Sequence, residues 1–363
     1  MINLKVGKNA MANKNLIQFE EGDLVDGRYK IIKSLGEGGM ASVWKAYDIK
    51  TDTEVAIKMA KLPTESEGIK KSRSRYKNEL AAFAVLNSDR HVVSLHDMFE
   101  TESTLVIVME CAEGGTLNNR YRDFYDMTLE EVKFYFSRLC LALEAATRYN
   151  IVHRDIKLDN VLIGTDGEVK LADFGISIKN IDDLEAKSTI GTPKYMSPEV
   201  CDGQIATHLS DIYSLGIMMY ECATGVAPFI FKSTNGSTQN SFLMAMQQIG
   251  KPLAPSKINK KIPQALENLI LQMLEKNPEF RPQSAAEVRK SLLAIKRENA
   301  ENVKPYVYRS KAFHSVKNRK KISSVGNVYS SLKGRFRTKF SLAFWIILFL
   351  IVVGLIVEMV VLI

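Results

Sequence analysis

The hydrophobic pattern changes along the chain, from short apolar runs in the first part to longer segments with helical periodicity after it. Short apolar runs that alternate or are rich in β-branched residues predict strands. These runs are 28–32, 43–47, 55–58, 91–93 and 105–109. Helical periodicity predicts one helix from Lys70 to Asn87 and another from Leu129 to Tyr149. The chain is therefore predicted to be rich in strands up to about residue 110 and rich in helices after it.

Turn and loop residues add to this prediction. Val161–Ile163 and Val169–Leu171 flank the dipeptide Asp166-Gly167, which predicts a β-hairpin. Residues 231–239 are mostly polar with Gly, Ser and Thr, which predicts a mobile surface loop. The first residues carry no clear period and no apolar segment after their lysines, so residues 1–28 are interpreted as an N-terminal extension and not as a secretory signal.

The last part of the chain is strongly apolar. Residues 342–357 form 16 consecutive apolar positions, and only Glu358 separates them from the apolar end at 359–363. As a helix, this stretch would measure about 33 Å, which is enough to cross a bilayer. A buried core helix is the alternative, but it would show a polar face, and this stretch has none. We expect a membrane-spanning helix at 341–363, with Glu358 close enough to its far end to reach the interface.

The net charge of +8 is distributed unevenly. From residue 302 onward there are 11 basic residues and one acid, whereas the first 301 residues hold 38 basic and 40 acidic groups. The nearly neutral first part argues against nucleic acid as a partner. The basic residues precede the predicted span, so we expect a single-pass tail anchor with this side in the cytoplasm, and an anionic membrane surface as a partner.

Four cysteines show neither CxxC pairing nor metal-ligand spacing, which is typical of reduced residues in a cytosolic domain. They are Cys111, Cys140, Cys201 and Cys222.

Candidate chemistry is concentrated in His153–Asn160, which reads HRDIKLDN. Asp155 can accept a proton from an incoming hydroxyl, and Lys157 can lie over a phosphate. Asn160 can hold a divalent metal ion, and Asp173 supplies a second acid at the start of Asp-Phe-Gly.

This pair of segments resembles the catalytic and metal-binding loops of the Hanks-type, eukaryotic-like serine/threonine protein kinases. The resemblance implies an α+β bilobal protein kinase fold, to which the transmembrane helix is added. The small lobe would hold a five-stranded antiparallel sheet with one regulatory helix, and the large lobe would be mainly helical. ATP and Mg²⁺ are the implied cofactors, with Mn²⁺ as an alternative ion.

A glycine-rich turn between the first two predicted strands fits the nucleotide loop of this family, because glycine lets backbone N–H groups approach phosphates. An ordinary hairpin turn is one alternative, and a dinucleotide-binding turn is another, although that would need a helix where 43–47 looks extended. Ala41 replaces the third glycine, as in a similar loop of bacterial membrane serine/threonine kinases. The implied ATP-binding residues are Leu35, Gly36, Glu37, Gly38, Gly39, Met40, Ala41, Ser42, Val43, Ala56, Lys58, Met109, Glu110, Ala112 and Leu162.

The resemblance also assigns roles to single residues. Lys58 in Val-Ala-Ile-Lys would bind the phosphates and form an ion pair with Glu79. The alternative is that Glu79 is a solvated glutamate on the surface of its helix. The catalytic group would comprise Asp155, Lys157, Lys58 and Glu79, and the metal ligands would be Asn160 and Asp173.

The segment between Asp173 and Glu199 resembles a kinase activation segment. Ser188 and Thr189 are candidate phosphorylation sites, and a phosphate on either could pair with Arg154. The alternative is that they are unmodified polar loop residues. Thr192 is expected at the substrate site, bonded to Asp155 and Lys157. Structural roles are implied for Glu199, Asp211 and Arg281.

These observations favour a membrane-anchored, non-specific serine/threonine protein kinase that phosphorylates protein substrates and itself, with a homodimer serving autophosphorylation. A membrane-tethered pseudokinase scaffold and a small-molecule kinase are the alternatives. The predicted domains are the extension 1–28, the kinase domain 29–295, the basic linker 296–340 and the span 341–363. Within the kinase domain, we expect a small lobe at 29–109, a hinge at 110–113 and a large lobe at 114–295.

Overall fold

The computed structural model describes residues 19–37, 41–61, 85–100, 104–123, 126–174, 192–230, 236–296 and 304–309. The chain divides into two compact units, 1–313 and 314–363, and all described residues belong to the first. The predicted span 341–363 lies outside the described residues. Within the described ranges, no helix is long and apolar enough to cross a membrane.

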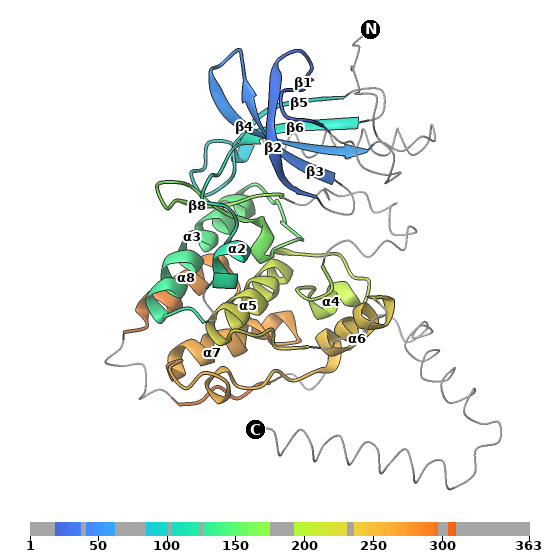
Figure 1. The fold of residues 1–363 in the computed structure, drawn as a ribbon. Coiled ribbons are helices and arrows are strands. Elements are labelled where there is room, and N and C mark those ends of the chain that lie inside the picture. The colour runs from blue at the N-terminus through green and yellow to red at the C-terminus, as the bar shows by residue number, and fades with distance from the viewer. Residues whose placement is uncertain are drawn as a thin grey trace, which may run out of the picture. The chain divides into compact units, whose positions relative to one another are not determined.

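One antiparallel sheet dominates the first part of the chain (Figure 1). Its strand order is β1-β2-β3-β4-β6-β5. The strands are β1 (Leu24–Val25), β2 (Tyr29–Glu37), β3 (Ala41–Asp48), β4 (Thr53–Lys61), β5 (Leu95–Glu100) and β6 (Thr104–Glu110). The prediction of five strands was therefore wrong. The additional strand β1 has only two residues, too few for a periodic pattern, and a turn through Gly27 at φ 63° returns the chain to β2.

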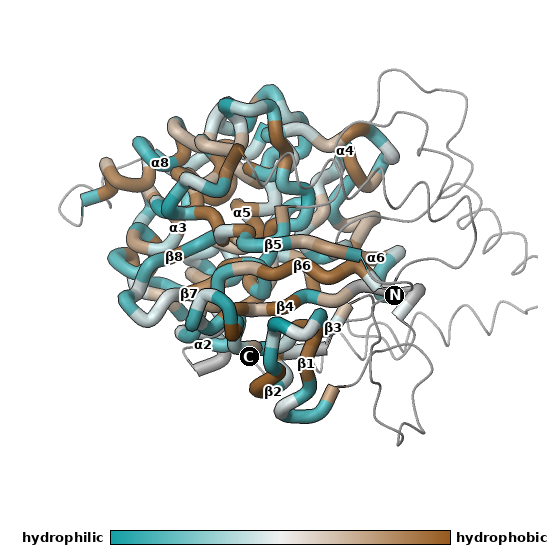
Figure 2. Tube along the Cα trace, turned by 90° about the horizontal axis from the view of Figure 1, so that it is seen from above, coloured by the Kyte–Doolittle hydropathy of each residue, from teal (hydrophilic) through white to brown (hydrophobic). Residues whose placement is uncertain are grey.

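Alternation along the strands gives the sheet two different faces. The outer face carries an apolar cluster that includes Tyr29, Trp44, Ile57 and Val108. In Figure 2 the hydrophobic colour follows β6 beside β4. On the opposite face, Val43 pairs with Lys58 and Ala56 pairs with Met109. Directly opposed residues in antiparallel strands point to the same side, so β3, β4 and β6 present this set of side chains together.

The prediction of a strand at 91–93 was wrong. Val92 forms only an isolated bridge to Leu171, and the strand itself is β5, a few residues later. Val92 and Val93 are apolar because they are buried against the loop and hairpin below the sheet, where Leu171 N–H donates to His91 O at 2.8 Å. Their hydrophobicity reports burial and not strand pairing.

Helices form the rest of the unit around a large apolar core. They are α2 (Leu117–Asp123), α3 (Leu129–Arg148), α4 (Pro198–Cys201), α5 (His208–Thr224), α6 (Gly236–Ile249), α7 (Gln264–Met273) and α8 (Ala285–Ala294), with short 3-10 turns η1 (Leu158–Asn160), η3 (Pro255–Lys257) and η4 (Pro278–Phe280). The prediction for α3 is confirmed, and Thr128 begins this helix through a capping box with Glu131.

Two loop predictions had different outcomes. The hairpin is confirmed as β7 (Val161–Ile163) and β8 (Val169–Leu171), joined through Gly167 at φ 80°. The loop predicted at 231–239 is wrong for its second half, because α6 begins at Gly236. The polar residues there lie in the first turn of the helix, where a polar composition is compatible with helix formation.

Candidate active site

The loop between α3 and β7 is fixed by backbone bonds to a buried carboxylate on α5. The N–H groups of His153 and Arg154 donate to Oδ2 and Oδ1 of Asp211 at 2.7 and 2.8 Å. Burial raises the pKa of Asp211 to about 7, although both N–H donors favour its ionised form. Arg154 adopts φ 69°, a left-handed conformation that is unfavourable for a residue other than glycine and is held here by these bonds. Asp211 thus tethers the backbone of the loop that carries Asp155.

His153 connects this loop to the segment that carries Asp173. Its Nε2 lies 2.9 Å from Ala172 O, and its Nδ1 accepts the N–H of Asp155 at 3.3 Å. This arrangement requires a proton on Nε2 and none on Nδ1, which is a neutral imidazole. Burial lowers the pKa of His153 to about 4, in agreement with the hydrogen bonds. The ring also packs on Phe174, with centroids 4.7 Å apart.

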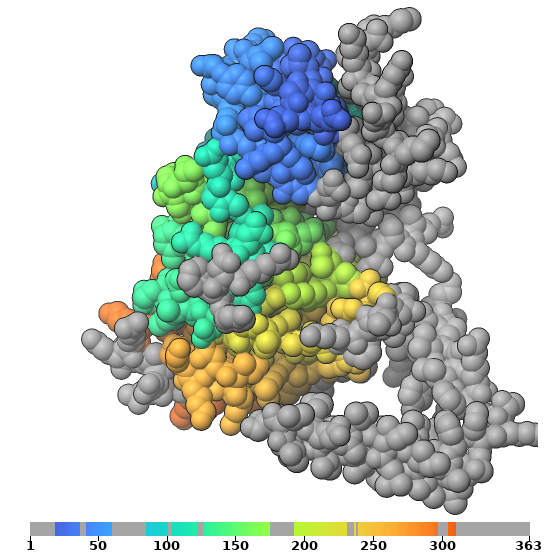
Figure 3. All heavy atoms as spheres, in the orientation of Figure 1, coloured from blue at the N-terminus to red at the C-terminus, as the bar shows by residue number. Residues whose placement is uncertain are grey.

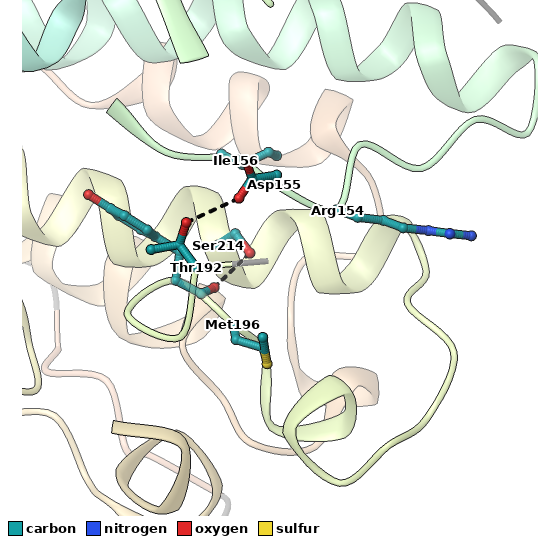
Figure 4. A pocket seen from close by; sticks show the side chains of 7 residues that line it. Arg154, Asp155, Ile156, Thr192, Met196 and Ser214 are labelled. Carbon is teal, nitrogen blue, oxygen red and sulfur yellow. Dashed lines mark hydrogen bonds between the residues drawn. The ribbon is translucent and has the colours of Figure 1, made fainter. Parts of the chain in front are cut away.

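The Asp155 carboxylate receives three donors, and Figure 4 shows the one from Thr192. Thr192 Oγ1 donates to Oδ1 at 3.2 Å, while Lys157 Nζ and Asn160 Nδ2 donate to Oδ2 at 2.5 and 3.2 Å. A carboxylate offers about four lone-pair sites, so roughly one remains for a further hydroxyl. The predicted bond from Thr192 to Asp155 is present. The second predicted bond, from Thr192 to Lys157, is not formed, because the carboxylate lies between them.

A backbone bond links the segments that carry Asn160 and Asp173, because Ala172 N–H donates to Asn160 O at 2.8 Å. Lys58 Nζ forms an ion pair with Asp173 Oδ1 at 2.7 Å, and this pair joins β4 to the segment after β8. Burial opposes ionisation of Asp173, but the Lys58 ammonium outweighs it and lowers the pKa of the carboxyl. Asn160 is buried and uses its amide nitrogen on the Asp155 backbone O at 2.7 Å, so its oxygen is the atom suited to a ligand.

This donor set fits a hard divalent cation. One carboxylate and one amide oxygen suit Mg²⁺, which takes few protein ligands and completes its shell with water and substrate phosphate oxygens. The described residues contain no group of three His, Cys, Asp or Glu side chains that could hold a metal ion by themselves. The candidate site is therefore incomplete without a phosphate-bearing substrate.

The inner face of the sheet lies above these groups. Val43, Lys58 and Ile107 are opposed across β3, β4 and β6, and so are Lys45, Ala56 and Met109. The glycine-rich turn is a connection between two strands, as the kinase resemblance implied, and no helix follows it, which excludes the dinucleotide-binding alternative. Leu35 is exposed at the end of this sheet, and Ser42 is buried.

The predicted hinge has specific contacts of its own. Glu110 N–H donates to Ser94 O at 2.9 Å, and its carboxylate pairs with Lys170 Nζ on β8 at 2.6 Å. Leu162 on β7 forms a bridge with Thr116, just before α2, which brings the hinge end beside the hairpin. Ala112 lies between these two contacts, just before a turn in which Gly115 N–H donates to Ala112 O at 3.4 Å.

Several predicted site residues lie outside the described residues, and their roles remain predictions. They are Gly38, Gly39, Met40, Glu79, Ser188 and Thr189. Arg154, the predicted partner of a phosphate, extends away from Asp155 in Figure 4. Its Nε is buried without a hydrogen-bond partner, and burial lowers the pKa of its guanidinium.

Glu199 and Arg281 form the predicted structural pair. Two parallel bonds of 2.8 Å join Nη1 and Nη2 to Oε1 and Oε2, and Ser210 donates to Oε1 at 2.7 Å. The other bonds of Arg281 go to backbone oxygens of Leu209, Glu275 and Lys276.

The sequence interpretation missed residues that support the segment around Thr192. Tyr195 OH donates to Glu221 Oε2 at 3.0 Å, Lys194 pairs with the same carboxylate, and Ser214 Oγ donates to Tyr195 O at 2.8 Å. Gln247 of α6 donates to Lys194 O at 2.6 Å. A buried glutamate near the end of an apolar helix was the available signal, since such a group needs partners.

The sequence comparisons agree with this geometry. Residues 29–293 match the profile of the protein kinase domain. The chain belongs to the protein kinase family. This kinase chain is 35% identical over 281 residues to a probable serine/threonine-protein kinase of Clostridium perfringens, covering 76% of the chain and 39% of that protein. It is 34% identical over 271 residues to serine/threonine-protein kinase PrkC of Bacillus subtilis, covering 74% of this chain and 40% of that protein. The kinase chain spans about two fifths of the length of these curated relatives. Members of the family use ATP with Mg²⁺.

Proposed function

We propose that this chain is a serine/threonine protein kinase that transfers the γ-phosphoryl group of ATP to protein hydroxyls. The observation that carries the proposal is the Asp155 carboxylate, oriented by Thr192, Lys157 and Asn160 with room for one more hydroxyl. The relatives named serine/threonine kinases support Ser and Thr as acceptors. A scaffold without catalysis would not need this arrangement.

Each residue of the site has its own role in the reaction. Asp155 orients the acceptor hydroxyl and takes up its proton. Lys157 and Lys58 place positive charge beside the phosphate oxygens, which stabilises the charge that develops during transfer. Asn160 and Asp173 would hold Mg²⁺, which supplies further charge neutralisation at the phosphates. For this to occur, Lys58 must share or exchange its contact with Asp173.

We propose further that residues 341–363 anchor the kinase in a membrane, with the catalytic unit on the cytoplasmic side. The uninterrupted apolar stretch and the basic residues before it support this proposal. The cytoplasmic side is also where ATP is available. Autophosphorylation of Ser188 or Thr189 within a homodimer is proposed as the activating event, and the unpartnered Nε of Arg154 is the observation that favours it.

The test uses the full chain in liposomes with Mg²⁺ and γ-labelled ATP, followed by mapping of phosphorylated residues. Asp155→Asn is expected to lower label incorporation by roughly 10²–10⁴-fold, because it removes the proton acceptor. Asp159→Asn is the matched control. Asp159 is exposed four residues away and only bonds Asn118, so this variant should label like the parent.

Label on Ser188 or Thr189 in the parent would support both the kinase and the activation proposals. Label elsewhere would retain the kinase proposal and remove the activation proposal. No label in the parent, with either Mg²⁺ or Mn²⁺, would favour the pseudokinase scaffold.

A further inference from the structure

A short segment beyond the last helix is fastened to the helical part of the unit. Residues 304–309, called the strap here, run extended beside α7. Asn268 of α7 holds the strap with both atoms of its amide, donating to Lys304 O and accepting from Tyr306 N–H, each at 2.8 Å. Tyr306 OH donates to Glu275 Oε1 at 2.9 Å, and Tyr308 OH donates to Leu274 O at 2.5 Å.

The strap alternates between two directions. Tyr306 and Tyr308 face the helices, and burial raises the pKa of both hydroxyls. Pro305, Val307 and Arg309 are exposed, and Val307 is 79% exposed. The period of two therefore buries the two aromatic rings and displays an aliphatic and a cationic side chain outside.

A second segment, 251–261, lies against the strap between α6 and α7. It contains four lysines and no acid, and Lys251 Nζ lies 6.0 Å from the ring centroid of Tyr308. Leu253 and Ile258 are 57% and 41% exposed. None of its lysines forms an ion pair with another described residue.

The backbone of this segment is held from below, so its exposed side chains are displayed by a fixed support. Tyr220 OH donates to Leu253 O at 3.0 Å, and Ser256 N–H donates to Glu267 Oε2 at 2.8 Å. Glu267 is buried beneath the segment. An exposed acid, Asp126, also contacts the segment, where its carboxylate accepts a hydrogen bond from Asn259 Nδ2 at 2.9 Å. The exposed surface of residues 251–261 is thus cationic and carries exposed aliphatic side chains. Part of it is visible in orange in Figure 3.

We propose that the strap and residues 251–261 together form a face that lies on an anionic lipid bilayer. Lysines interspersed with exposed aliphatic side chains match the boundary between headgroups and acyl chains of such a membrane. Binding to an acidic protein surface would use the lysines but would not require Leu253, Ile258 and Val307 to be exposed. The inference rests on the proposed membrane anchor. Residues 310–340 connect the strap to the predicted span, and even fully extended they would keep Arg309 within about 110 Å of the bilayer.

The strap has a defined part in this proposal. It displays Val307 and Arg309 beside Lys251, so that both segments can contact the same surface. Each basic residue near an anionic surface favours the bound orientation by about fivefold, so neutralising three of them should weaken it by roughly 100-fold.

The experiment is lysine footprinting of the full chain in liposomes with a water-soluble amine-reactive reagent. Phosphatidylcholine liposomes are compared with liposomes that also contain phosphatidylglycerol. Lys251, Lys257, Lys260 and Lys261 should react several-fold more slowly in the anionic liposomes. Lys30, Lys33 and Lys50 are exposed on the sheet and serve as internal controls, whose rates should not change.

Two matched triple variants test the cause. Lys257→Gln/Lys260→Gln/Lys261→Gln should restore the reactivity of Lys251 in anionic liposomes, whereas Lys30→Gln/Lys33→Gln/Lys50→Gln should leave it slow. Equal rates in both kinds of liposome would overturn the proposal. Equal slowing in both would also overturn it, because it would show that protein and not lipid covers the face.

The anchor is tested separately in the same samples by flotation in alkaline carbonate. A parent chain that floats but shows no lipid-dependent footprint would retain the anchor and remove the face. A chain that fails to float, yet shows the footprint, would retain the face and remove the anchor.

Discussion

Two ion pairs join distant parts of this kinase chain, and they are built in opposite ways. Arg281 and Glu199 meet through two bonds of 2.8 Å, with side chains 0% and 5% exposed. Lys58 and Asp173 meet through one bond of 2.7 Å, with side chains 22% and 37% exposed. The first pair is closed to solvent, and the second is open to it.

The difference shows how the same chemistry serves structure in one place and function in another. Arg281 forms five hydrogen bonds, as many as a guanidinium has N–H donors, so nothing is left for a ligand. Lys58 and Asp173 remain accessible, so each can exchange its partner, the ammonium for a phosphate and the carboxylate for a cation. We therefore expect the closed pair to control stability and the open pair to control catalysis.

Removal of the closed pair should have the largest effect on folding. Arg281→Met leaves the Glu199 carboxylate buried without its cation, and this should lower the free energy of unfolding by about 3–5 kcal/mol. Denaturant unfolding of the full chain in detergent measures it. Lys290→Met, at an exposed position on α8, is the control and should change stability by less than about 0.5 kcal/mol. Equal midpoints for both variants would show that the closed pair does not stabilise the fold.

Removal of the open pair should reverse that outcome. Lys58→Met is expected to lower phosphoryl transfer by about 10²–10³-fold, because a positioned charge beside the phosphates is lost. Its effect on the free energy of unfolding should stay below about 1 kcal/mol, since the pair is partly solvated. Label incorporation and unfolding are measured on the same preparation, with Lys30→Met as control. A stability loss as large as that of Arg281→Met would remove the distinction between the pairs.

The sequence predicted local chemistry better than distant contacts. Asp155, Lys157 and Asn160 fall within six residues, so one turn η1 and the flanking loop bring them together. The ion pair between Lys58 and Asp173 was not predicted, because it depends on how the sheet lies over the hairpin. No local pattern encodes that placement.

The fold errors have a similar origin. Val92 and Val93 are buried, but this segment forms only one bridge, to Leu171 of β8, and does not pair with the six-stranded sheet; hydrophobicity does not distinguish these cases. The early start of α6 at Gly236 was missed because its first turn is polar. Composition predicted a loop there, whereas tertiary packing of the later turns determines the helix.

His153, bonded to Ala172 beside the open pair, gives a further test through the pH dependence of stability. Its pKa of about 4 lies below the ordinary value of 6.5, so the folded state binds fewer protons than the unfolded state between these values. The contribution of His153 to the free energy of unfolding is therefore complete above pH 6.5. It is lost as the pH falls toward 4, and the total loss is about 3 kcal/mol. His153→Gln keeps a donor and an acceptor but does not titrate, so its stability should depend less on pH in this window. Unfolding midpoints at several pH values measure the difference, and parallel curves would contradict it.

The smallest effect is expected at a third pair, between Lys170 on β8 and Glu110 in the hinge. Its side chains are 14% and 29% exposed, and the pair joins the hairpin to the predicted hinge, where Glu110 is one of the implied ATP-binding residues. Lys170→Gln removes one charge but leaves the Glu110 backbone bond to Ser94 O in place, so the free energy of unfolding should change by less than about 1 kcal/mol. The KM for ATP, measured at low and high salt, should differ from the parent only at low salt, because salt screens partly exposed charges. A change in KM that persists at high salt would place Lys170 with the open pair, as a group that positions the nucleotide.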